Sequence, residues 1–463
     1  MNRESKTEND NSNSMVRDSV ATLEENLIGE LQNGDLHKRL EEEIKVKIIT
    51  QTDDFDALEQ EWTELVRECN THIYQTYEWN RIWWKHFGTK KNLHIVALYK
   101  GNKLAAIAPF FEDDVTLFGR KVYSCLRFLG SFVSQPKGEP LLGTVSYSDY
   151  LDCIIHPGFE KIFYKLILQH FKEIKSEFDE IVFDEVSSKS AISKVMIPQM
   201  EKINYEWSYK IEQASSSPVI QLDSTWGAYL NSMNAKERYN VRRYYKRSIG
   251  NTKIFNIKKA EPVEELSGVV AEFIRMHQEQ WNSRGFPGTF SEKRMYDFFI
   301  EVTKSFYDKD WMEFNLAVPV DEENKIVAVD VLLTYKNRVY LMHRGMDENP
   351  RYRKQGPGNV LLYARLNEAI KDGAEVFDML RGSEEFKLRM ATKLNKNKKI
   401  TIGSGSKKDK VLSGLVKRIL KVISEGRGEI SHLKLVFKGK PLFEGLTDYK
   451  QFLLRRIEHR SKK

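Results

Sequence analysis

Cysteine is scarce in this chain of 463 residues. There are three, Cys69, Cys125 and Cys153, and none is spaced like a metal ligand. Such an odd, sparse set argues against a disulfide framework and fits a reducing compartment. The chain also has no run of 18 or more apolar residues, and its polar N-terminal segment has no signal-peptide pattern. We therefore expect a cytoplasmic protein without a metal site or a membrane span.

The central part of the chain has little net charge of either sign. Residues 1–45 carry −5, residues 407–463 carry +10 and the whole chain carries +7, which leaves +2 for residues 46–406. A basic body would have indicated nucleic acid, so we expect no specific nucleic-acid partner. Contact with an anionic membrane surface explains a basic tail equally well, and would place the protein at the inner membrane face.

What is present is an ordinary globular composition, with 41% hydrophobic and 30% charged residues, in a chain long enough for two domains. Residues 1–45 are acidic and poor in aromatic residues, which predicts a largely disordered segment. In the tail, 406–463, apolar residues from Leu412 to Ile423 recur at helical spacing and predict a basic amphipathic helix. Docking of this helix onto the body and contact with a membrane both remain open.

The body between these segments shows the same order of helices and strands twice. Residues 46–215 contain helices, a strand meander, a crossover helix at 158–175 and a strand at 180–184. Residues 216–405 repeat this order, with helices at 226–247, 263–284 and 292–307, strands at 313–319, 326–335 and 338–345, a further helix from Asn359 and a strand at 375–380. Asp223 or Ser224 is expected to cap the helix at 226, and Ser291 the helix at 292. We predict a duplicated α/β (α+β) fold with two mixed, twisted sheets flanked by helices.

A Gly-Pro-Gly loop precedes the last long helix of the second half. Its glycines let a bound group approach the backbone, and Pro357 suits a first helical turn. A helix start has unpaired N–H groups and a partial positive charge, so this loop favours a phosphate cradle. An ordinary loop with a basic rim is the alternative. The candidate cradle residues are Arg353, Lys354, Gln355, Gly356, Gly358 and Asn359.

The pattern Arg353-x-x-Gly356-x-Gly358 resembles the Arg/Gln-x-x-Gly-x-Gly/Ala signature of GNAT acetyltransferases, whose loop holds the pyrophosphate of acetyl-CoA. The segments 280–288, 357–362, 377–382 and 385–387, with Asp347 ahead of the loop, resemble the CelD-like branch associated with exopolysaccharide and cellulose synthesis. The resemblance is good from about 225 to 395 and looser from 46 to 215. It implies a tandem double GNAT fold, shared with FemAB-type peptidyltransferases. The first half offers only His156-Pro157-Gly158, so one half is expected to bind the nucleotide and the other to be a scaffold or substrate wall.

The resemblance implies an acyltransferase that moves an acetyl or other acyl group from acyl-CoA to an amine acceptor, such as an amino sugar of a surface polysaccharide. Two alternatives remain. One is transfer of an amino acid from aminoacyl-tRNA, as in FemAB-like enzymes. The other is a non-catalytic scaffold of a polysaccharide-synthesis complex.

Amide formation needs a group that accepts the proton of the amine and a donor that stabilises the thioester oxygen. His343 is the leading candidate base, because it lies near the end of the strand before the loop and its ordinary pKa is near neutral. A buried, hydrogen-bonded histidine is the alternative. The further candidate catalytic residues are Asp330, Asp347 and Glu385, and the candidate substrate-binding residues are Trp281, Arg284, Asp378 and Lys387.

Each carboxylate also has a structural interpretation. Asp330 lies within an apolar strand, where amine binding or pairing with an arginine would explain its burial. Asp347 and Asp378 are alternatively loop caps, and Glu385 alternatively stabilises a helix start. Trp281 is alternatively a core residue.

Two further features leave alternatives open. Phe386 stands where many relatives have a tyrosine near the position of the acid, so Tyr352, Tyr363 or unassisted loss of the thiolate would have to replace it. A basic stripe, interleaved with Tyr239 and Tyr244, is either a solvated face or a contact for an anionic carrier or the 3′-phosphate of the coenzyme. Its residues are Arg238, Arg242 and Lys246.

Overall fold

The structure is a computed structural model that describes residues 44–117, 120–131, 148–174, 176–202, 208–261 and 263–403. The predicted disordered segment, apart from its last two residues, and the predicted tail helix lie outside these ranges. None of the described helices combines the length and apolar character needed to cross a bilayer.

The N-terminal half begins with helices packed beside a strand meander and ends with a crossover helix and a strand. Its elements are β1 (Ile44–Ile49), α3 (Thr52–Asp56), α4 (Glu59–Glu68), α5 (Tyr77–Phe87), β2 (Asn92–Lys100), β3 (Lys103–Leu117), β4 (Arg120–Phe128), β5 (Ile154–Ile155), α6 (Glu160–Glu173), β6 (Glu180–Ser187) and α7 (Ile197–Lys202).

The C-terminal half repeats this order and adds a pair of helices at its start and a strand at its end. Its elements are β7 (Ser208–Gln221), α8 (Trp226–Ser232), α9 (Ala235–Tyr245), β8 (Phe255–Lys259), α10 (Val263–Ser283), α11 (Lys293–Tyr307), β9 (Met312–Pro319), β10 (Ala328–Tyr335), β11 (Arg338–Met346), α12 (Pro350–Arg353), α13 (Pro357–Lys371), β12 (Val376–Asp378), α14 (Glu385–Met390) and β13 (Lys393–Gly403).

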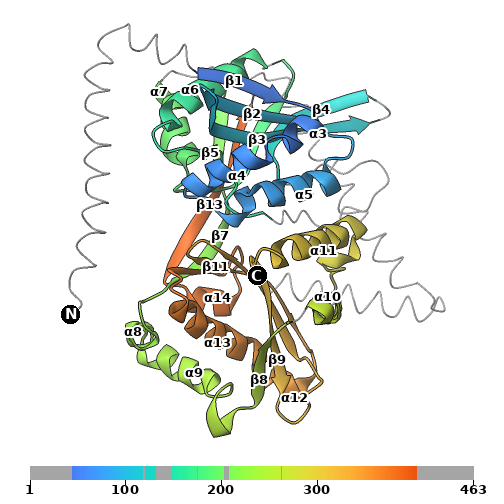
Figure 1. Cartoon of the computed structure of the whole chain (residues 1–463), viewed down its shortest axis with the longest axis vertical. Coiled ribbons are helices and arrows are strands. Elements are labelled where there is room, and N and C mark those ends of the chain that lie inside the picture. Colours follow the sequence, from blue (N-terminus) through green and yellow to red (C-terminus); the bar gives the residue numbers. More distant parts are fainter. Residues whose placement is uncertain are drawn as a thin grey trace, which may run out of the picture.

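The two predicted sheets are the two ends of one continuous sheet of thirteen strands, in the order β1-β2-β3-β4-β6-β13-β7-β12-β11-β10-β9-β8, with β5 against β3. Figure 1 shows the two halves one above the other, with β7 and β13 running between them. The parallel pairs are β4 with β6 and β11 with β12. A crossover helix, α6 or α13, connects the strands of each pair.

Hydrophobic clusters on both faces hold the helices on the sheet, and one of them packs α13 against β8, β9 and β10. On one face, α4 and α5 of the first half share a core with α10 and α11 of the second, where the rings of Trp79 and Phe298 are 5.3 Å apart. The opposite face is covered by α6 in the first half and by α13 with α8 and α9 in the second. The two halves are therefore joined both through the sheet and through a common helical core.

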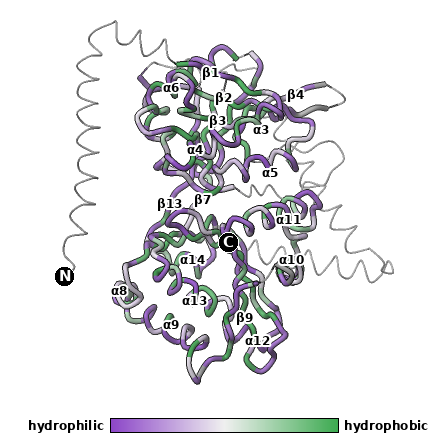
Figure 2. The backbone as a smooth tube through the Cα atoms, viewed as in Figure 1, coloured by the Kyte–Doolittle hydropathy of each residue, from purple (hydrophilic) through white to green (hydrophobic). Residues whose placement is uncertain are grey.

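Two strands at the centre of the sheet were not predicted. β7 is rich in Ser and exposed from Lys210 to Ala214, whereas β13 is rich in Lys and Asn and is exposed or half-buried along most of its length. The waist between the halves, where they run, is accordingly coloured mostly hydrophilic in Figure 2. Each pairs with the other over most of its length, so backbone hydrogen bonds rather than apolar burial define them.

Helix boundaries differ from the prediction at three places. The predicted helix at 226–247 is two helices, separated at Met233 and Asn234, because Asn234 caps α9 by accepting from the N–H of Glu237. Thr225 rather than Asp223 or Ser224 caps α8. Ser291 does not cap α11, since its hydroxyl donates to Gly288 O and the helix begins after Glu292.

Candidate functional site

The Gly-Pro-Gly loop forms the start of α13. Gly356 is the N-cap residue and adopts φ +66°, a left-handed conformation that favours glycine. Pro357 is the first helical residue, and the N–H of Gly358 lies in the first turn, where helix geometry supplies no backbone acceptor. No acidic side chain lies in this turn, so the positive end of the helix is left without a carboxylate of its own helix.

Helix α9 forms a wall beside this loop. A Cβ added to Gly356 would lie 2.7 Å from Cε1 of Tyr244, so glycine is also required for close approach. Arg247 donates through Nη1 to the carbonyl of Gln355. The guanidinium groups of Arg243 and Arg247 lie 4.7 and 4.9 Å from the centre of the Tyr244 ring. The positive charge beside the cradle therefore comes from α9 and the turn after it. The sequence of the loop alone did not predict this contribution.

The basic residues of the loop itself lie at the surface. Arg353 pairs with Glu348 at 2.8 Å, and Arg351 pairs with Asp321 and Glu322 at 2.5 and 2.7 Å. Lys354 is exposed. The structure thus brings together the predicted glycines of the cradle, while neighbouring carboxylates already engage Arg353.

The strands beside the cradle diverge. Parallel pairing between β11 and β12 is confined to Arg338–Tyr340, so β11 continues from Leu341 to Met346 without β12 beside it. Within this stretch the register against β10 shifts, because Val331 is opposite His343 and Leu332 is opposite Leu341. Met342 is the extra residue of a β-bulge, and a bulge leaves backbone groups outside the ladder.

His343 follows the bulge and faces α10 and α11. Its ring lies 5.9 Å from Phe273, 5.7 Å from Phe290 and 5.6 Å from His277. Burial, with the nearby charges of His277 and Lys387, holds the pKa of His343 well below its ordinary value. His343 is therefore neutral at physiological pH, the form that accepts a proton.

His277 and Trp281 complete this aromatic lining. The Trp281 indole N–H donates to Nε2 of His277 at 3.0 Å, so Nδ1 of a neutral His277 carries the hydrogen. That buried Nδ1 has no hydrogen-bond partner within the described ranges. Burial lowers the pKa of His277 to about 4. Trp281 is 37% exposed at the rim, rather than part of the core.

Asp330 pairs with an arginine. Both of its oxygens accept from Arg344, at 2.6 and 2.7 Å, and its side chain is 1% exposed. Arg344 lies over the ring of Phe386 at 5.4 Å and touches the α13 start, since a Cβ on Gly358 would be 3.1 Å from its Cδ. Burial raises the pKa of Asp330, and Arg344 opposes this shift. Its role is therefore to hold Arg344 between the strand and the cradle.

Three further candidates are exposed or have local partners. Asp347 accepts from the N–H of Asn349 at 2.8 Å and pairs with Lys325 at 3.5 Å, which makes it a loop cap. Glu385 is exposed in the first turn of α14, and Arg284 is exposed after α10. The positions of Asp347 and Glu385 fit the structural interpretations of these residues, and the catalytic or substrate-binding roles of all three stay predictions.

Asp378 lies at the junction of the two halves. It accepts from the hydroxyl of Tyr150 at 2.6 Å and from the N–H of Leu380 at 2.8 Å. Burial raises its pKa to about 7. The ring of His72 stacks on Tyr150 at 4.2 Å, and His72 Nδ1 lies 3.1 Å from the hydroxyl of Tyr340, so residues of both halves meet here.

A second group of charges surrounds this junction. Arg381 pairs with Asp149 at 3.1 Å and with Glu185 at 3.3 Å. Lys387 is 9% exposed, donates to the carbonyl of Arg381 at 3.1 Å and pairs with Glu384 at 3.5 Å. Burial raises the pKa of Asp149 to about 6 and lowers that of Lys387.

The backbone is strained at the same junction. Tyr150, Glu185 and Leu380 have φ of +57°, +53° and +54°, values that non-glycine residues rarely adopt. Strained residues persist only where the surrounding contacts enforce them, and they gather at functional sites. Sequence patterns did not single out Tyr150 or Glu185, because the strain arises only when the two halves meet.

The two tyrosines considered as acids have other partners. The Tyr352 hydroxyl donates to Glu322 at 2.6 Å, and the Tyr363 hydroxyl donates to Sδ of Met390 at 3.4 Å. Burial raises the pKa of Tyr363. Neither phenol is therefore placed to protonate a group in the opening beside Met342.

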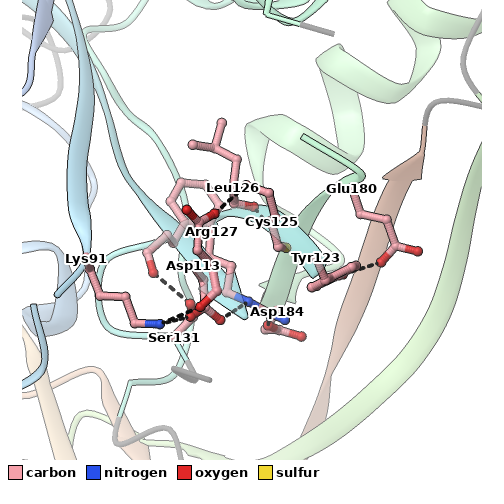
Figure 3. Close-up of polar contacts among 12 residues, drawn as sticks. Lys91, Asp113, Tyr123, Cys125, Leu126, Arg127, Ser131, Glu180 and Asp184 are labelled. Atoms are coloured by element: carbon pink, nitrogen blue, oxygen red, sulfur yellow. Dashed lines mark hydrogen bonds and ion pairs between the residues drawn. The ribbon is translucent and has the colours of Figure 1, made fainter. Parts of the chain in front are cut away.

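The equivalent positions of the N-terminal half are filled. At the start of α6, the carboxylate of Glu160 accepts from the N–H of Gly158 at 2.9 Å. The pairing of β4 with β6 ends at Arg127, one residue before β4 itself ends. Arg127 pairs with Asp113 at 3.1 Å and with Asp184 at 2.8 Å, and Lys91 also contacts Asp113. Figure 3 shows this network across the strands.

No group of three or more His, Cys, Asp or Glu side chains suited to a metal ion occurs among the described residues. A shallow depression in the N-terminal half contains none of the candidate residues. It is lined by Glu61, Glu64, Leu65, Lys100, Asn102, Lys103 and Leu104.

Comparison with known proteins agrees with this geometry. Residues 235–388 match the family model described as an acetyltransferase (GNAT) domain. These residues contain the cradle, the bulged strand and His343. This part of the C-terminal half is therefore similar to a GNAT domain. No curated protein sequence matches the chain.

A solved structure with a TM-score above 0.5 supports the fold, and two others are more distantly similar. A crystal structure of FemX is similar to 77% of this chain over 96% of its own, with 13% identity and a TM-score of 0.51. L-PGS from Bacillus licheniformis matches 78% of this chain over 96% of its own, with 10% identity and a TM-score of 0.45. A tandem GNAT protein from the clavulanic acid biosynthesis pathway matches 79% over 99%, with 10% identity and a TM-score of 0.40.

Proposed function

We propose that this protein binds an acyl-CoA in its C-terminal half and transfers the acyl group to an amine. The observation that carries the proposal is the opening between β11 and β12. It has a bulged strand and a neutral histidine on one side and a glycine cradle at a helix start on the other. An acyl-CoA needs both features close together, because its diphosphate binds at the cradle and its thioester reacts beside the strand and the histidine.

The residues present fit the donor. A diphosphate would lie at Gly356 and Gly358, where the backbone can be approached and no carboxylate of α13 opposes an anion. Arg247 and Arg243 lie beside the cradle and would add positive charge. The pantetheine arm would run into the opening beside Met342, and the thioester carbonyl would meet a backbone donor of the bulge.

The amine nitrogen attacks the thioester carbonyl carbon, the C–N bond forms, and the C–S bond breaks. His343, which its lowered pKa keeps neutral, takes the proton of the amine nitrogen as the C–N bond forms and that nitrogen becomes acidic. A backbone N–H of the bulge stabilises the developing oxyanion. The thiolate leaves unaided, since a thiol with an ordinary pKa near 8.5 is a tolerable leaving group near neutral pH.

The acceptor would approach from the junction between the halves. Asp378 ends β12 and Lys387 lies on α14, and Tyr150 and Asp149 contact this region from the N-terminal half. Trp281 at the rim offers a flat apolar face of the kind on which a sugar ring packs. An amino sugar of a surface polysaccharide fits this combination, in line with the resemblance to the CelD-like branch. The basic tail would then bring the enzyme to an anionic membrane.

The test is calorimetric titration of the full chain with acetyl-CoA and, separately, with bulk tRNA, followed by an acyl-transfer assay on a panel of amino sugars with thiol release as the readout. We expect binding of acetyl-CoA and transfer to at least one amino sugar. Binding of tRNA without acetyl-CoA would support the aminoacyl-tRNA alternative, to which the FemX-like fold is equally suited. Binding of neither would support a scaffold.

A further inference from the structure

The arginines of the described residues divide into two groups. Ten of them form ion pairs with carboxylates: Arg81, Arg127, Arg275, Arg294, Arg344, Arg351, Arg353, Arg365, Arg381 and Arg389. No carboxylate of the described ranges lies within ion-pair distance of Arg242, Arg243 or Arg247 on α9 and the turn after it. Some other arginines, such as Arg67 and Arg284, also have no carboxylate at ion-pair distance among the described residues, but those of α9 and the turn after it lie beside the cradle.

Two of these arginines lie against the same aromatic ring. Their guanidinium groups both contact the ring of Tyr244, at 4.7 Å for Arg243 and 4.9 Å for Arg247. The backbone carbonyl of Arg247 accepts from the N–H groups of Ile254 and Phe255, which ties this turn to β8. Two like charges fixed near one ring, without an anion, repel each other. Such an arrangement is stabilised when an anion binds.

Helix α9 also has an exposed aromatic side chain near these arginines. Tyr239 is 65% exposed and lies four residues before Arg243, so the two side chains are neighbours on α9. An exposed aromatic ring flanked by cations is suited to stacking with a nucleobase. The adjacent Gly356 of the cradle touches Tyr244 of the same helix, which places a diphosphate site and this face next to each other.

We propose that α9 is the subsite for the nucleotide end of the donor, in which Arg243 and Arg247 bind a phosphate monoester and Tyr239 stacks on a purine. The inference rests on the proposed acyl-CoA function and refines it. Such a subsite would bind a donor with a 3′-phosphate more tightly than a donor without it. A phosphopantetheine arm carried on a protein lacks both groups and would not be recognised here.

The experiment measures affinities of the full chain for CoA, for dephospho-CoA, which lacks the 3′-phosphate, and for phosphopantetheine. We expect the wild type to bind CoA about 10- to 100-fold more tightly than dephospho-CoA, as a charge-assisted hydrogen bond gives. Arg243→Gln should reduce this ratio to near one. Arg67→Gln, which removes an exposed arginine of α4, is the matched control and should keep the wild-type ratio.

Tyr239→Ala separates the two parts of the subsite. It should weaken CoA and dephospho-CoA by the same several-fold factor, because both contain the adenine, and leave phosphopantetheine affinity unchanged. The inference fails if the wild type binds CoA and dephospho-CoA with equal affinity, or if Arg243→Gln keeps the wild-type affinity ratio. Either result leaves the proposed acyl transfer in place. If Arg243→Gln weakens only salt-sensitive tRNA binding, α9 is a nucleic-acid surface and the inference also fails. If no CoA compound binds the wild type, the proposed function fails.

Discussion

The two halves of this protein have the same order of elements but differ at the two places where a GNAT-type site needs space. The first place is the start of the crossover helix. In the N-terminal half Glu160 accepts from the N–H of Gly158, so a carboxylate of the chain occupies the anion position. In the C-terminal half Gly356 leads into α13 without an acidic residue in the first turn. One helix start is neutralised internally, and the other is left for a ligand.

The second place is the gap beside the parallel strand pair. In the N-terminal half the strands stay paired to the end of β4, and the buried charges of Lys91, Asp113, Arg127 and Asp184 connect them. In the C-terminal half β11 extends past β12 and contains a bulge. A duplicated fold therefore need not provide two sites, because a few side chains decide whether the same backbone is filled or open.

The largest expected effect comes from a histidine substitution in each half. His343→Gln cannot accept the proton, so we expect turnover to fall by about 10²–10⁴-fold, with acetyl-CoA affinity nearly unchanged. His170→Gln, on α6 of the N-terminal half, should leave turnover at the wild-type level. The measurement is thiol release with an amino-sugar acceptor.

The pH dependence of the same reaction sharpens this result. Since the pKa of His343 is held well below its ordinary value, the wild-type rate should not rise through an ionisation near pH 6.5. Higher pH should partly rescue His343→Gln, because more of the amine is then unprotonated. Near-normal turnover of His343→Gln at neutral pH would contradict its role as a base.

The buried arginine–carboxylate pairs give the second comparison. Asp113→Asn leaves Lys91 and Arg127 short of negative charge, and Asp330→Asn does the same to Arg344. Removing one partner of a buried pair costs about 3–5 kcal/mol of unfolding free energy, so we expect both variants to be destabilised. Only Asp330→Asn should also weaken acetyl-CoA binding, because Arg344 touches the cradle at Gly358.

Denaturant unfolding measures the first quantity and calorimetry the second. Equal acetyl-CoA affinities in the two variants would show that Arg344 does not belong to the site. A large loss of affinity in Asp113→Asn would show that the N-terminal network supports the site from a distance.

Each half also contains a carboxyl with a raised pKa. Burial raises the pKa of Asp378 and of Asp152 to about 7. The native state then binds more protons than the unfolded chain between pH 4 and 7, so each carboxyl destabilises the fold as pH rises through this window. Relative to wild type, Asp378→Asn and Asp152→Asn should gain about 2 kcal/mol of stability between pH 5 and 7.

The two variants should differ in activity. Asp378 lies beside the diverging strands, so Asp378→Asn should also lower turnover about tenfold, in line with an effect of roughly 1.4 kcal/mol on the barrier. Asp152→Asn should not change turnover. A relative stability that is constant with pH would contradict the pKa shift of the residue concerned.

The smallest expected effect comes from alanine substitution of the glycine before the crossover helix in each half. Gly356→Ala introduces a Cβ 2.7 Å from Tyr244, whereas Gly158→Ala meets nothing within 4 Å, and both glycines have positive φ. Both variants should lose about 1 kcal/mol of stability from the backbone conformation. Only Gly356→Ala should bind acetyl-CoA more weakly, by about tenfold, as the wall of α9 is displaced. A matching loss in Gly158→Ala would indicate a site in the N-terminal half as well.

Substitution of Gly358 is less informative. A Cβ there would lie 2.8 Å from Sδ of Met346 and 3.1 Å from Cδ of Arg344, so Gly358 also serves the packing of α13 against β11. A valine at this position would disturb the helix as well as any bound diphosphate.

Much of the fold and part of the site were determined by local sequence. Apolar periodicity predicted α10, α11 and β9 to β11 close to their observed bounds, because each buries one face or both. The glycine loop was predicted at the start of α13, since left-handed backbone and a proline in the first turn have few other interpretations. His343 was also predicted near the end of its strand, and it lies within β11 close to the end at Met346.

Only the tertiary structure decided the rest. Strands β7 and β13 have polar sequences, and what makes them strands is the backbone of distant strands on either side. The partner of Asp330 is fourteen residues away on another strand, and Tyr150 and Asp378 come from different halves. The open gap beside β11 and the filled gap beside β4 differ through side chains that converge from several strands. Local sequence patterns cannot predict which of these side chains meet, because their contacts depend on which surfaces the folded chain brings together.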